Sequence, residues 1–436
     1  MKPAANRIDA GFQATLDRRQ QKGRLRRLTL AAPDAVDFSS NGYLSLSTNP
    51  QVKRKYTELL QSHSTLALGS GGSRLLDGNS TFAEQLEQDV ATFHGAPSAL
   101  LFNSGFEANT GLFSCMANDG DIVIYDEYIH ASVHDGLKLS RAAKIPFRHN
   151  TVWDATATSL SSLASLESVL EKLLRSKSGI DYYNGTKNIF IAVEGVYSMD
   201  GDAAPMLDIV QCVKRKLPYG NGLIIVDEAH STGIMGKSGR GLVCQLGLED
   251  EIWARVHTFG KAMGCSGAMV LCSETTRSYL INYARSLIYT TAMGFPTLAA
   301  IRATYDYLIS GEADALLSKL HALVQTTHHL LSTLCKYRQP ANGIFGIDEA
   351  MPQSPIMPLF TSKAHDLATH CQKRGFMLRP IVFPTVPKGT DRVRLCLHAG
   401  NTIDEVTALV RVIEEWVVLQ TTAAPSTTKS QIPSRL

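Results

Sequence analysis

The sequence predicts an α/β fold, with a mostly parallel sheet in a large domain and a smaller α/β domain at the C-terminal end. Residues 223–226 form a short apolar run without alternation, as is typical of a strand buried in a parallel sheet. Residues 354–420 show alternating strand and helix patterns a second time. A chain of 436 residues is too long for one small core and fits one large domain plus a smaller one.

The composition is that of an ordinary globular protein, with 44% hydrophobic and 19% charged residues. A net charge of +3 gives no general attraction to nucleic acid or to an anionic membrane. We expect no membrane span and no signal peptide, because no apolar run has the required length. The eight cysteines lack close paired spacing, so we expect no metal site and a reducing compartment.

Two stretches near the middle of the chain carry the main chemical signal. Asp227 ends the apolar strand and His230 follows it, while Lys261 comes 34 residues later (261 − 227). Ligands of open α/β sheets bind beyond the carboxyl ends of strands. A lysine for a Schiff base and a carboxylate for the pyridine nitrogen are what pyridoxal phosphate (PLP) requires. For either stretch alone, a structural aspartate and a surface lysine are the competing interpretation.

The N-terminal third contains an arginine-rich segment and a glycine-rich loop. The arginines of residues 7–30 alternate with apolar positions as on a helix, either as a solvated face or to reach an anionic substrate. Residues 37–46 read as a strand entering a turn. Residues 68–79 are dense in glycine, which suits a loop covering a ligand, although flexible linkers look similar.

Two strand-turn-helix patterns follow, each with a polar residue at the strand end. In residues 99–109, Ser104 and the amides of Gly105 and Phe106 open a helix and are placed to bind phosphate. His130 lies beyond the strand that begins at residue 121. Its imidazole can stack on a flat cofactor ring, or it can be a hydrogen-bonded core histidine.

The second half of the chain returns to the sheet and then enters the smaller domain. Residues 155–190 read as a helical stretch followed by a surface loop at 177–187. Residues 297–335 read as helical. In the strand 392–397, Arg392 and Arg394 share one face, where an arginine can form a forked pair with a carboxylate.

These motifs together resemble the α-oxoamine synthases, which are PLP enzymes of fold type I. The matching segments run in order along nearly the whole chain, at 39–44, 69–74, 103–106, 130–132, 149–150, 194–202, 227–233, 258–261, 288–291 and 384–390. We accordingly divide the chain into an N-terminal arm (1–46), a large PLP-binding domain (47–292), a small C-terminal domain (293–420) and a flexible tail (421–436).

The resemblance implies a role for each matching residue. Lys261 would hold PLP, Asp227 would pair with its ring nitrogen and His230 with its phenolic oxygen. His130 would stack on the ring, which completes the catalytic set. The other cofactor contacts would be Ser104, Gly105, Phe106, Glu194, Ser198, Thr258, Thr290 and Thr291. The substrate contacts would be Arg26, Asn41, Ser73 and Arg394.

The resemblance also implies the reaction and the partners. The family condenses an amino acid with an acyl-CoA and releases CO2, and its segment 289–291 crosses to the partner of a homodimer. L-alanine and pimeloyl-CoA are favoured here, because the chain most resembles the family members that join these substrates in biotin synthesis. Ser73 supports alanine, since glycine-using relatives commonly carry threonine at this position. Gly42 replaces the usual aspartate of the motif Asn-Asp-Tyr-Leu-Gly and leaves the acyl partner open.

Several alternatives share this scaffold. They are a 5-aminolevulinate synthase, a 2-amino-3-ketobutyrate ligase, a serine palmitoyltransferase-like enzyme, a synthase that releases a polyketide chain, a plain aminotransferase and a non-catalytic partner subunit. Lys261, Asp227 and His230 are all present, which argues against the non-catalytic subunit.

The last three residues resemble a targeting signal. Ser434-Arg435-Leu436 is a close variant of the Ser-Lys-Leu signal read by the peroxisomal import receptor. A chance tripeptide is the alternative. We expect a peroxisomal location, or otherwise a cytoplasmic one.

Overall fold

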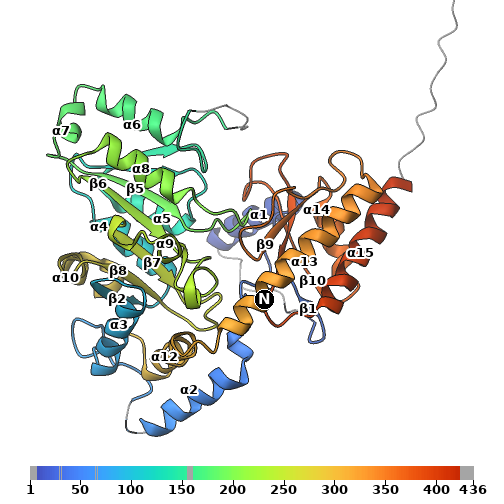
Figure 1. Ribbon diagram of the computed structural model, residues 1–436, viewed down its shortest axis with the longest axis horizontal. Coiled ribbons are helices and arrows are strands. Elements are labelled where there is room, and N and C mark those ends of the chain that lie inside the picture. Colours follow the sequence, from blue (N-terminus) through green and yellow to red (C-terminus); the bar gives the residue numbers. More distant parts are fainter. Residues whose placement is uncertain are drawn as a thin grey trace, which may run out of the picture.

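The computed structural model describes residues 7–28, 30, 32–63, 65, 67–154 and 161–422, and it shows a large and a smaller body side by side (Figure 1). The expected targeting signal at 434–436 lies outside the described residues. Within the described ranges, no helix is long and apolar enough to cross a membrane.

The large domain is built on a seven-stranded sheet. Its strand order is β2 (Ser98–Phe102), β8 (Ala268–Cys272), β7 (Ala254–Thr258), β6 (Gly222–Asp227), β5 (Ile189–Glu194), β3 (Ile122–Asp126) and β4 (Ala143–Phe147). β4, β3, β5, β6 and β7 pair in parallel, and only β8 runs antiparallel to its neighbours. The prediction of a mostly parallel sheet is therefore confirmed.

Both faces of this sheet are buried, which explains the unbroken apolar run in the sequence. Ile224 and Val226 of β6 pack into one core, and Ile225 packs into the other. One face is covered by α4 (Gly105–Cys115), α5 (Ala131–Leu139), α10 (Glu274–Tyr283) and α11 (Arg285–Ile288). The other is covered by α3 (Thr81–Phe93), α6 (Leu166–Leu174) and α8 (Met206–Lys216).

One longer helix and several short elements complete the large domain. They are η1 (Leu46–Thr48), α2 (Pro50–Ser62), α7 (Gly179–Tyr183), η2 (Lys237–Gly239), α9 (Leu242–Leu246) and η3 (Glu249–Glu251). The prediction of a plain surface loop at 177–187 was wrong in part, because α7 lies within it. Tyr182 of α7 is buried and donates a hydrogen bond to the Gly120 carbonyl at 2.7 Å, which fixes the segment against the sheet.

The smaller body contains the second sheet that the sequence pattern predicts. β9 (Ile356–Phe360) and β11 (Arg379–Ile381) both pair antiparallel with the central β12 (Arg392–Cys396). The helices that accompany it are α13 (Asp314–Arg338), α14 (Ala364–Gln372) and α15 (Ile403–Thr422). The preceding α12 (Phe295–Ile309) packs against α2 and α3 of the large domain.

The N-terminal arm joins the smaller body. After α1 (Arg7–Gln21), whose described side chains are all exposed, β1 (Val36–Asp37) pairs in parallel with β10 (Phe376–Met377). Phe38 is fully buried, and its carbonyl accepts a hydrogen bond from the Cys396 amide at 2.9 Å. This anchoring fixes the path of the next residues, which enter the cleft between the two bodies.

Candidate active site

The carboxyl ends of four neighbouring strands converge at one edge of the large sheet. β3 ends at Asp126, β5 at Glu194, β6 at Asp227 and β7 at Thr258. Glu194 and Asp227 are direct Cα partners in the β5–β6 register. Lys261 follows the end of β7 by three residues (261 − 258), so the predicted meeting of lysine and carboxylate at adjacent strand ends is confirmed.

An open cleft with a volume of about 580 Å³ lies in front of this edge. Its wall contains the predicted site residues Asn41, His130, Ser198, His230, Lys261 and Arg394. The wall is completed by residues 127–129, 131, 134, 199–200 and 384–387. Both bodies contribute to it, since Arg394 belongs to β12 and Lys261 to the large domain.

The amine of Lys261 is suited to proton transfer. Burial lowers its pKa below the usual lysine value, and the nearby Arg394 lowers it further, although the Asp227 and Glu194 carboxylates oppose the shift. Burial, reinforced by Lys261, Arg394 and His130, also lowers the pKa of His230 well below its ordinary value, so its imidazole is neutral. Burial and the neighbouring Asp227 raise the pKa of Glu194 well above normal.

A hydrogen-bonded chain fixes Asp227, and sequence reasoning had assigned no role to its middle members. Asn109 of α4 donates from Nδ2 to Asp227 Oδ2 at 2.7 Å and to Ser132 Oγ at 3.0 Å. Ser132 Oγ in turn lies 2.7 Å from His130 Nδ1. The other oxygen of Asp227 accepts from the Ala229 amide at 2.9 Å. The spacing of one helical turn from Gly105 to Asn109 (109 − 105) was the available signal.

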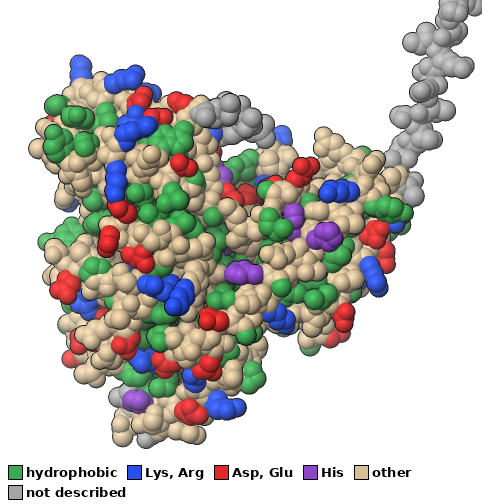
Figure 2. Space-filling model, viewed as in Figure 1, with side chains coloured by type: hydrophobic (Ala, Val, Ile, Leu, Met, Phe, Trp, Pro, Cys, Tyr) green, Lys and Arg blue, Asp and Glu red, His purple; other side chains and the backbone are tan. Residues whose placement is uncertain are grey.

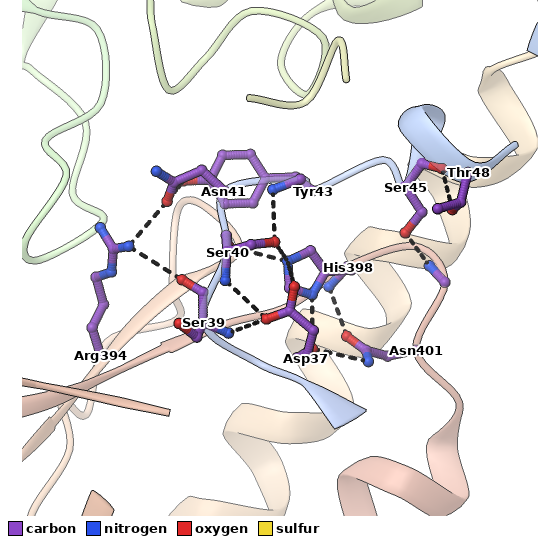
Figure 3. A network of polar contacts seen from close by, with 12 residues as sticks. Asp37, Ser39, Ser40, Asn41, Tyr43, Ser45, Thr48, Arg394, His398 and Asn401 are labelled. Atoms are coloured by element: carbon purple, nitrogen blue, oxygen red, sulfur yellow. Dashed lines mark hydrogen bonds and ion pairs between the residues drawn. The ribbon is translucent and has the colours of Figure 1, made fainter. Parts of the chain in front are cut away.

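The N-terminal arm contributes Asn41 to the cleft wall, and a network of polar contacts holds the surrounding segment in place (Figure 3). Arg394 donates to Asn41 Oδ1 at 3.1 Å and to the Ser39 and Ser198 carbonyls at 3.3 and 3.1 Å. His398 holds the same segment, since its ring contacts Ser40 Oγ and the Asp37 carbonyl, each at 3.0 Å. These contacts place the guanidinium of Arg394 and the amide of Asn41 side by side.

Tyr43 reaches further into the site from the same segment. Its hydroxyl lies 2.8 Å from His230 Nδ1, and burial raises the pKa of this tyrosine well above its normal value. Tyr43 belongs to a motif recognised in the sequence, but no role had been assigned to it.

A second group of residues forms a cradle at the N-terminus of α4. Ser104 caps the helix by accepting the Glu107 amide at 3.1 Å. A Cβ added at Gly105 would lie 2.4 Å from Thr258 Cγ2, so only glycine lets the two elements approach this closely. Thr258 Oγ1 is buried and has no hydrogen-bond partner among the described residues. Amide groups at a helix start beside an unused hydroxyl are suited to a phosphate.

The residues present fit PLP. Thr258, Gly105 and the start of α4 can hold its phosphate, and the buried Asp227 can pair with its ring nitrogen. The neutral His230 can donate to its phenolic oxygen, and Lys261 can bind its aldehyde. The exposed edge of His130 lines the cleft where a flat ring would lie.

Some predicted residues lie away from the cleft of their own chain. Thr290 Oγ1 and the Thr291 carbonyl accept from Asn103 Nδ2 at 3.2 and 2.9 Å, beside the α4 N-terminus. The Ser73 carbonyl caps a tight turn by accepting the amides of residues 76 and 78. Arg26 is exposed, whereas its neighbour Arg24 lies over the ring of Phe383, next to the cleft wall.

The family model for aminotransferase class I and II matches residues 33–413. The chain is 49% identical over 408 residues to an 8-amino-7-oxononanoate synthase of Emericella nidulans, covering 93% of this chain and 95% of the relative. It is 38% identical to the aminoacyl transferase sphA of Aspergillus fumigatus, covering 86% of this chain and 80% of that one.

Solved structures share the fold. A serine palmitoyltransferase of Sphingomonas wittichii superposes with a TM-score of 0.78 at 23% identity, covering 96% of this chain and all of that chain (100%). An 8-amino-7-oxononanoate synthase of Francisella tularensis superposes with a TM-score of 0.66 at 26% identity, covering 89% of this chain and 99% of that one. The fold is therefore that of fold type I transferases.

Proposed function

Because the chain belongs to the class I and II aminotransferase family, and within it to the PLP-dependent α-oxoamine synthases, we propose that it condenses L-alanine with pimeloyl-CoA. The product would be 8-amino-7-oxononanoate, an intermediate of biotin biosynthesis. The observation that carries the proposal is that Lys261 and Arg394 line one cleft with Asp227 buried near Lys261, in a chain 49% identical to an 8-amino-7-oxononanoate synthase.

Each proposed step uses a group that lies in this cleft. When bound, PLP supplies a protonated ring that stabilises negative charge at the amino acid α-carbon. Arg394 binds the amino acid carboxylate, with Asn41 holding the guanidinium in place. Lys261, whose pKa is lowered, accepts the α-proton at Nζ and returns it later.

The reaction balances with one proton from solvent, which the departing CoA thiolate takes up as its carbon–sulfur bond breaks. A carbon–carbon bond forms between the α-carbon and the thioester carbonyl carbon, and CoA leaves as its thiol. The carboxylate held by Arg394 then leaves as CO2, and the α-carbon takes up a proton. Asp227 and the neutral His230 keep their positions throughout, because each already has a fixed hydrogen-bond partner in Asn109 or Tyr43.

A broader substrate range is the second candidate. The chain is also 38% and 36% identical to two aminoacyl transferases named sphA. The cleft, about 580 Å³ in volume, is open rather than enclosed, which suits acyl chains of several lengths. The decisive experiment is a matrix of amino acids against acyl-CoA chain lengths, measured by release of CoA thiol. The proposal requires the highest kcat/KM for L-alanine with pimeloyl-CoA, and a higher value for another pair would replace it.

We further propose a homodimer, because a group of large apolar side chains is exposed around the α4 N-terminus. The group consists of Leu68, Leu75, Leu76, Phe106 and Tyr289. The glycine-rich loop and the segment 289–292 form one surface, since the Ala292 amide donates to the Gly72 carbonyl at 2.8 Å. An exposed apolar patch of this kind marks a protein–protein contact.

The peroxisomal location stays a proposal that rests on residues 434–436 alone. A fluorescent protein fused at the N-terminus should co-localise with a peroxisomal marker and become diffuse when these three residues are removed. A diffuse distribution of the intact fusion would contradict the proposal.

A further inference from the structure

We propose that His149 is a positioning residue of the cleft: as an imidazolium held between Asp126 and Asp202, it ties the loop that carries His130 to the loop that carries Ser198. The inference deepens the proposed function and rests on it for the identity of the cleft, but its geometry involves residues to which no role has been given.

Both ring nitrogens of His149 face carboxylates. Nδ1 lies 2.9 Å from Asp126 Oδ1, and Nε2 lies 2.8 Å from Asp202 Oδ2. A carboxylate oxygen accepts hydrogen bonds, so a ring that donates to both must carry two protons and a positive charge. Burial alone would lower the pKa of His149, but the hydrogen bonds to the two aspartates outweigh it and raise the pKa to about 10.

The two aspartates belong to the two loops that form one wall of the cleft. Asp126 ends β3 four residues before His130 (130 − 126), and Asp202 follows Ser198 by four residues (202 − 198). Residues 127–131 and 198–200 line the cleft directly. The His149 ring therefore connects the two segments, because it contacts Asp126 at the start of one and Asp202 at the end of the other.

Neighbouring groups reinforce the same connection. Asn150 repeats the bridge, since its amide donates to Asp126 Oδ2 at 2.9 Å and its side chain donates to Asp202 Oδ2 at 2.5 Å. The His149 amide donates to Glu127 Oε1 at 3.0 Å. The ring of Tyr128, which lines the cleft, stacks on the imidazole at 4.4 Å.

The remaining groups around His149 are compatible with a cation. Tyr197 contacts the ring edge-on at 4.5 Å from the large-domain side. From the small domain, the nearby cation Arg392 is paired with Asp200. A neutral imidazole has one N–H, so one aspartate would keep its Asn150 donor but lose the one from His149, and the connection between the two loops would weaken.

The test compares Asp202→Asn with the parent protein, and uses Asp181→Asn as the matched control. Asp181 makes an exposed ion pair with Lys187 at 3.6 Å, on α7 and away from the cleft wall. Three quantities are measured: the pKa of His149 by NMR titration, the Kd of the apoprotein for PLP, and kcat and KM as functions of pH.

In Asp202→Asn, the His149 pKa should fall from about 10 into the assay range, since only one carboxylate still faces the ring. As the pH rises through the new pKa, kcat should fall by roughly ten-fold and PLP should bind more weakly, while KM for the amino acid changes little. In the parent and in Asp181→Asn, kcat and PLP affinity should show no such fall over the same pH range.

His149→Gln provides a second variant, which cannot be charged at any pH. It should show the lowered kcat and the weakened PLP binding at every pH, without the pH-dependent fall expected for Asp202→Asn. Unchanged PLP affinity and pH profiles in both variants would overturn the inference. The NMR and PLP measurements need no substrate, so they remain decisive even if the proposed substrates are wrong.

Discussion

At the scale of single residues, Lys261 has the surroundings that a proton-transfer group requires. Its amine is enclosed by Asp227, Glu194 and Arg394, and burial lowers its pKa. Lys261→Ala should remove the covalent attachment of PLP and lower kcat by at least roughly 10²–10⁴-fold, the usual contribution of a general base. Steady-state turnover and mass spectrometry after borohydride reduction measure both effects. Lys237→Ala, on η2, is the control, and comparable turnover in both variants would refute the assignment.

The unused hydroxyl of Thr258 leads to a second prediction, in which ligand affinity and stability separate. Thr258 Oγ1 is buried without a partner among the described residues, and an unsatisfied buried hydroxyl costs on the order of 1–3 kcal/mol. Thr258→Val should therefore leave the apoprotein as stable as the parent or more stable, yet weaken PLP binding. Urea unfolding of the apoprotein and a PLP titration measure the two quantities.

Thr232→Val is the matched control for this substitution. The Thr232 hydroxyl lies 2.6 Å from the Glu228 carbonyl and 2.9 Å from His257 Nδ1, so both contacts are satisfied within the chain. This variant should destabilise the apoprotein. Loss of apoprotein stability in Thr258→Val of the same size would show that its hydroxyl has a structural partner.

The sequence was informative for residues at strand ends and less so for residues that act through them. Asp227 and Lys261 could be identified because a polar residue that ends a buried strand is a strong local signal. Asn109 and Tyr43 could not be assigned in the same way. Their roles depend on contacts 118 and 187 positions away in the chain, which no local pattern contains.

At the scale of elements, the N-terminus of α4 can lie against the end of β7 only because Gly105 has no side chain. A methyl group at this position would lie 2.4 Å from Thr258 Cγ2, and the clash would push the helix start away from the β7 end. Gly105→Ala should weaken PLP binding by on the order of ten-fold or more, because the phosphate donors are displaced. Gly346→Ala, in the smaller domain, is the control, since a Cβ there meets no atom within 4 Å. Equal PLP affinity in both variants would contradict the assignment of the α4 N-terminus as the phosphate-binding site.

The arm shows which element-level features the sequence does not reveal. Residues 37–46 were expected to form a strand entering a turn, and a two-residue strand is present at Val36–Asp37. Its partner is β10, some 340 residues away (376 − 36), so the pairing depends on tertiary packing. This pairing, together with the His398 contacts, decides that Asn41 faces Arg394.

At the scale of the whole molecule, buried neutral histidines make stability depend on pH. Burial, reinforced by Arg255, lowers the pKa of His94 to about 3, against 6.5 in an unfolded chain. Between these values the unfolded state binds a proton that the folded state does not, so stability is full above pH 6.5 and falls as the pH decreases. The slope for one such histidine is about 1.4 kcal/mol per pH unit.

His94→Phe tests this dependence. The variant should lose part of the acid-side slope in urea unfolding of the apoprotein between pH 7 and pH 5, whatever its absolute stability. Phenylalanine has no titrating group, so the difference isolates the histidine. His365→Phe, at an exposed position of α14, should keep the slope of the parent. The same slope in His94→Phe and the parent would show that His94 does not contribute to the loss of stability at acid pH.

The largest-scale prediction concerns association of two chains. Leu76 and Tyr289 are 77% and 71% exposed on the surface formed by the glycine-rich loop and the segment 289–292, next to the phosphate cradle. Two-fold association through this surface would bury the patch and bring Ser73, Thr290 and Thr291 toward the partner's cleft. Leu76→Asp should therefore shift the protein toward monomer in sedimentation velocity and reduce activity in parallel, because a buried unpaired carboxylate opposes the contact. Leu207→Asp, the same substitution at an exposed position of α8, should leave both properties unchanged. A parent protein that sediments as an active monomer at its working concentration would exclude the dimer and with it any role of these three residues in a partner's site.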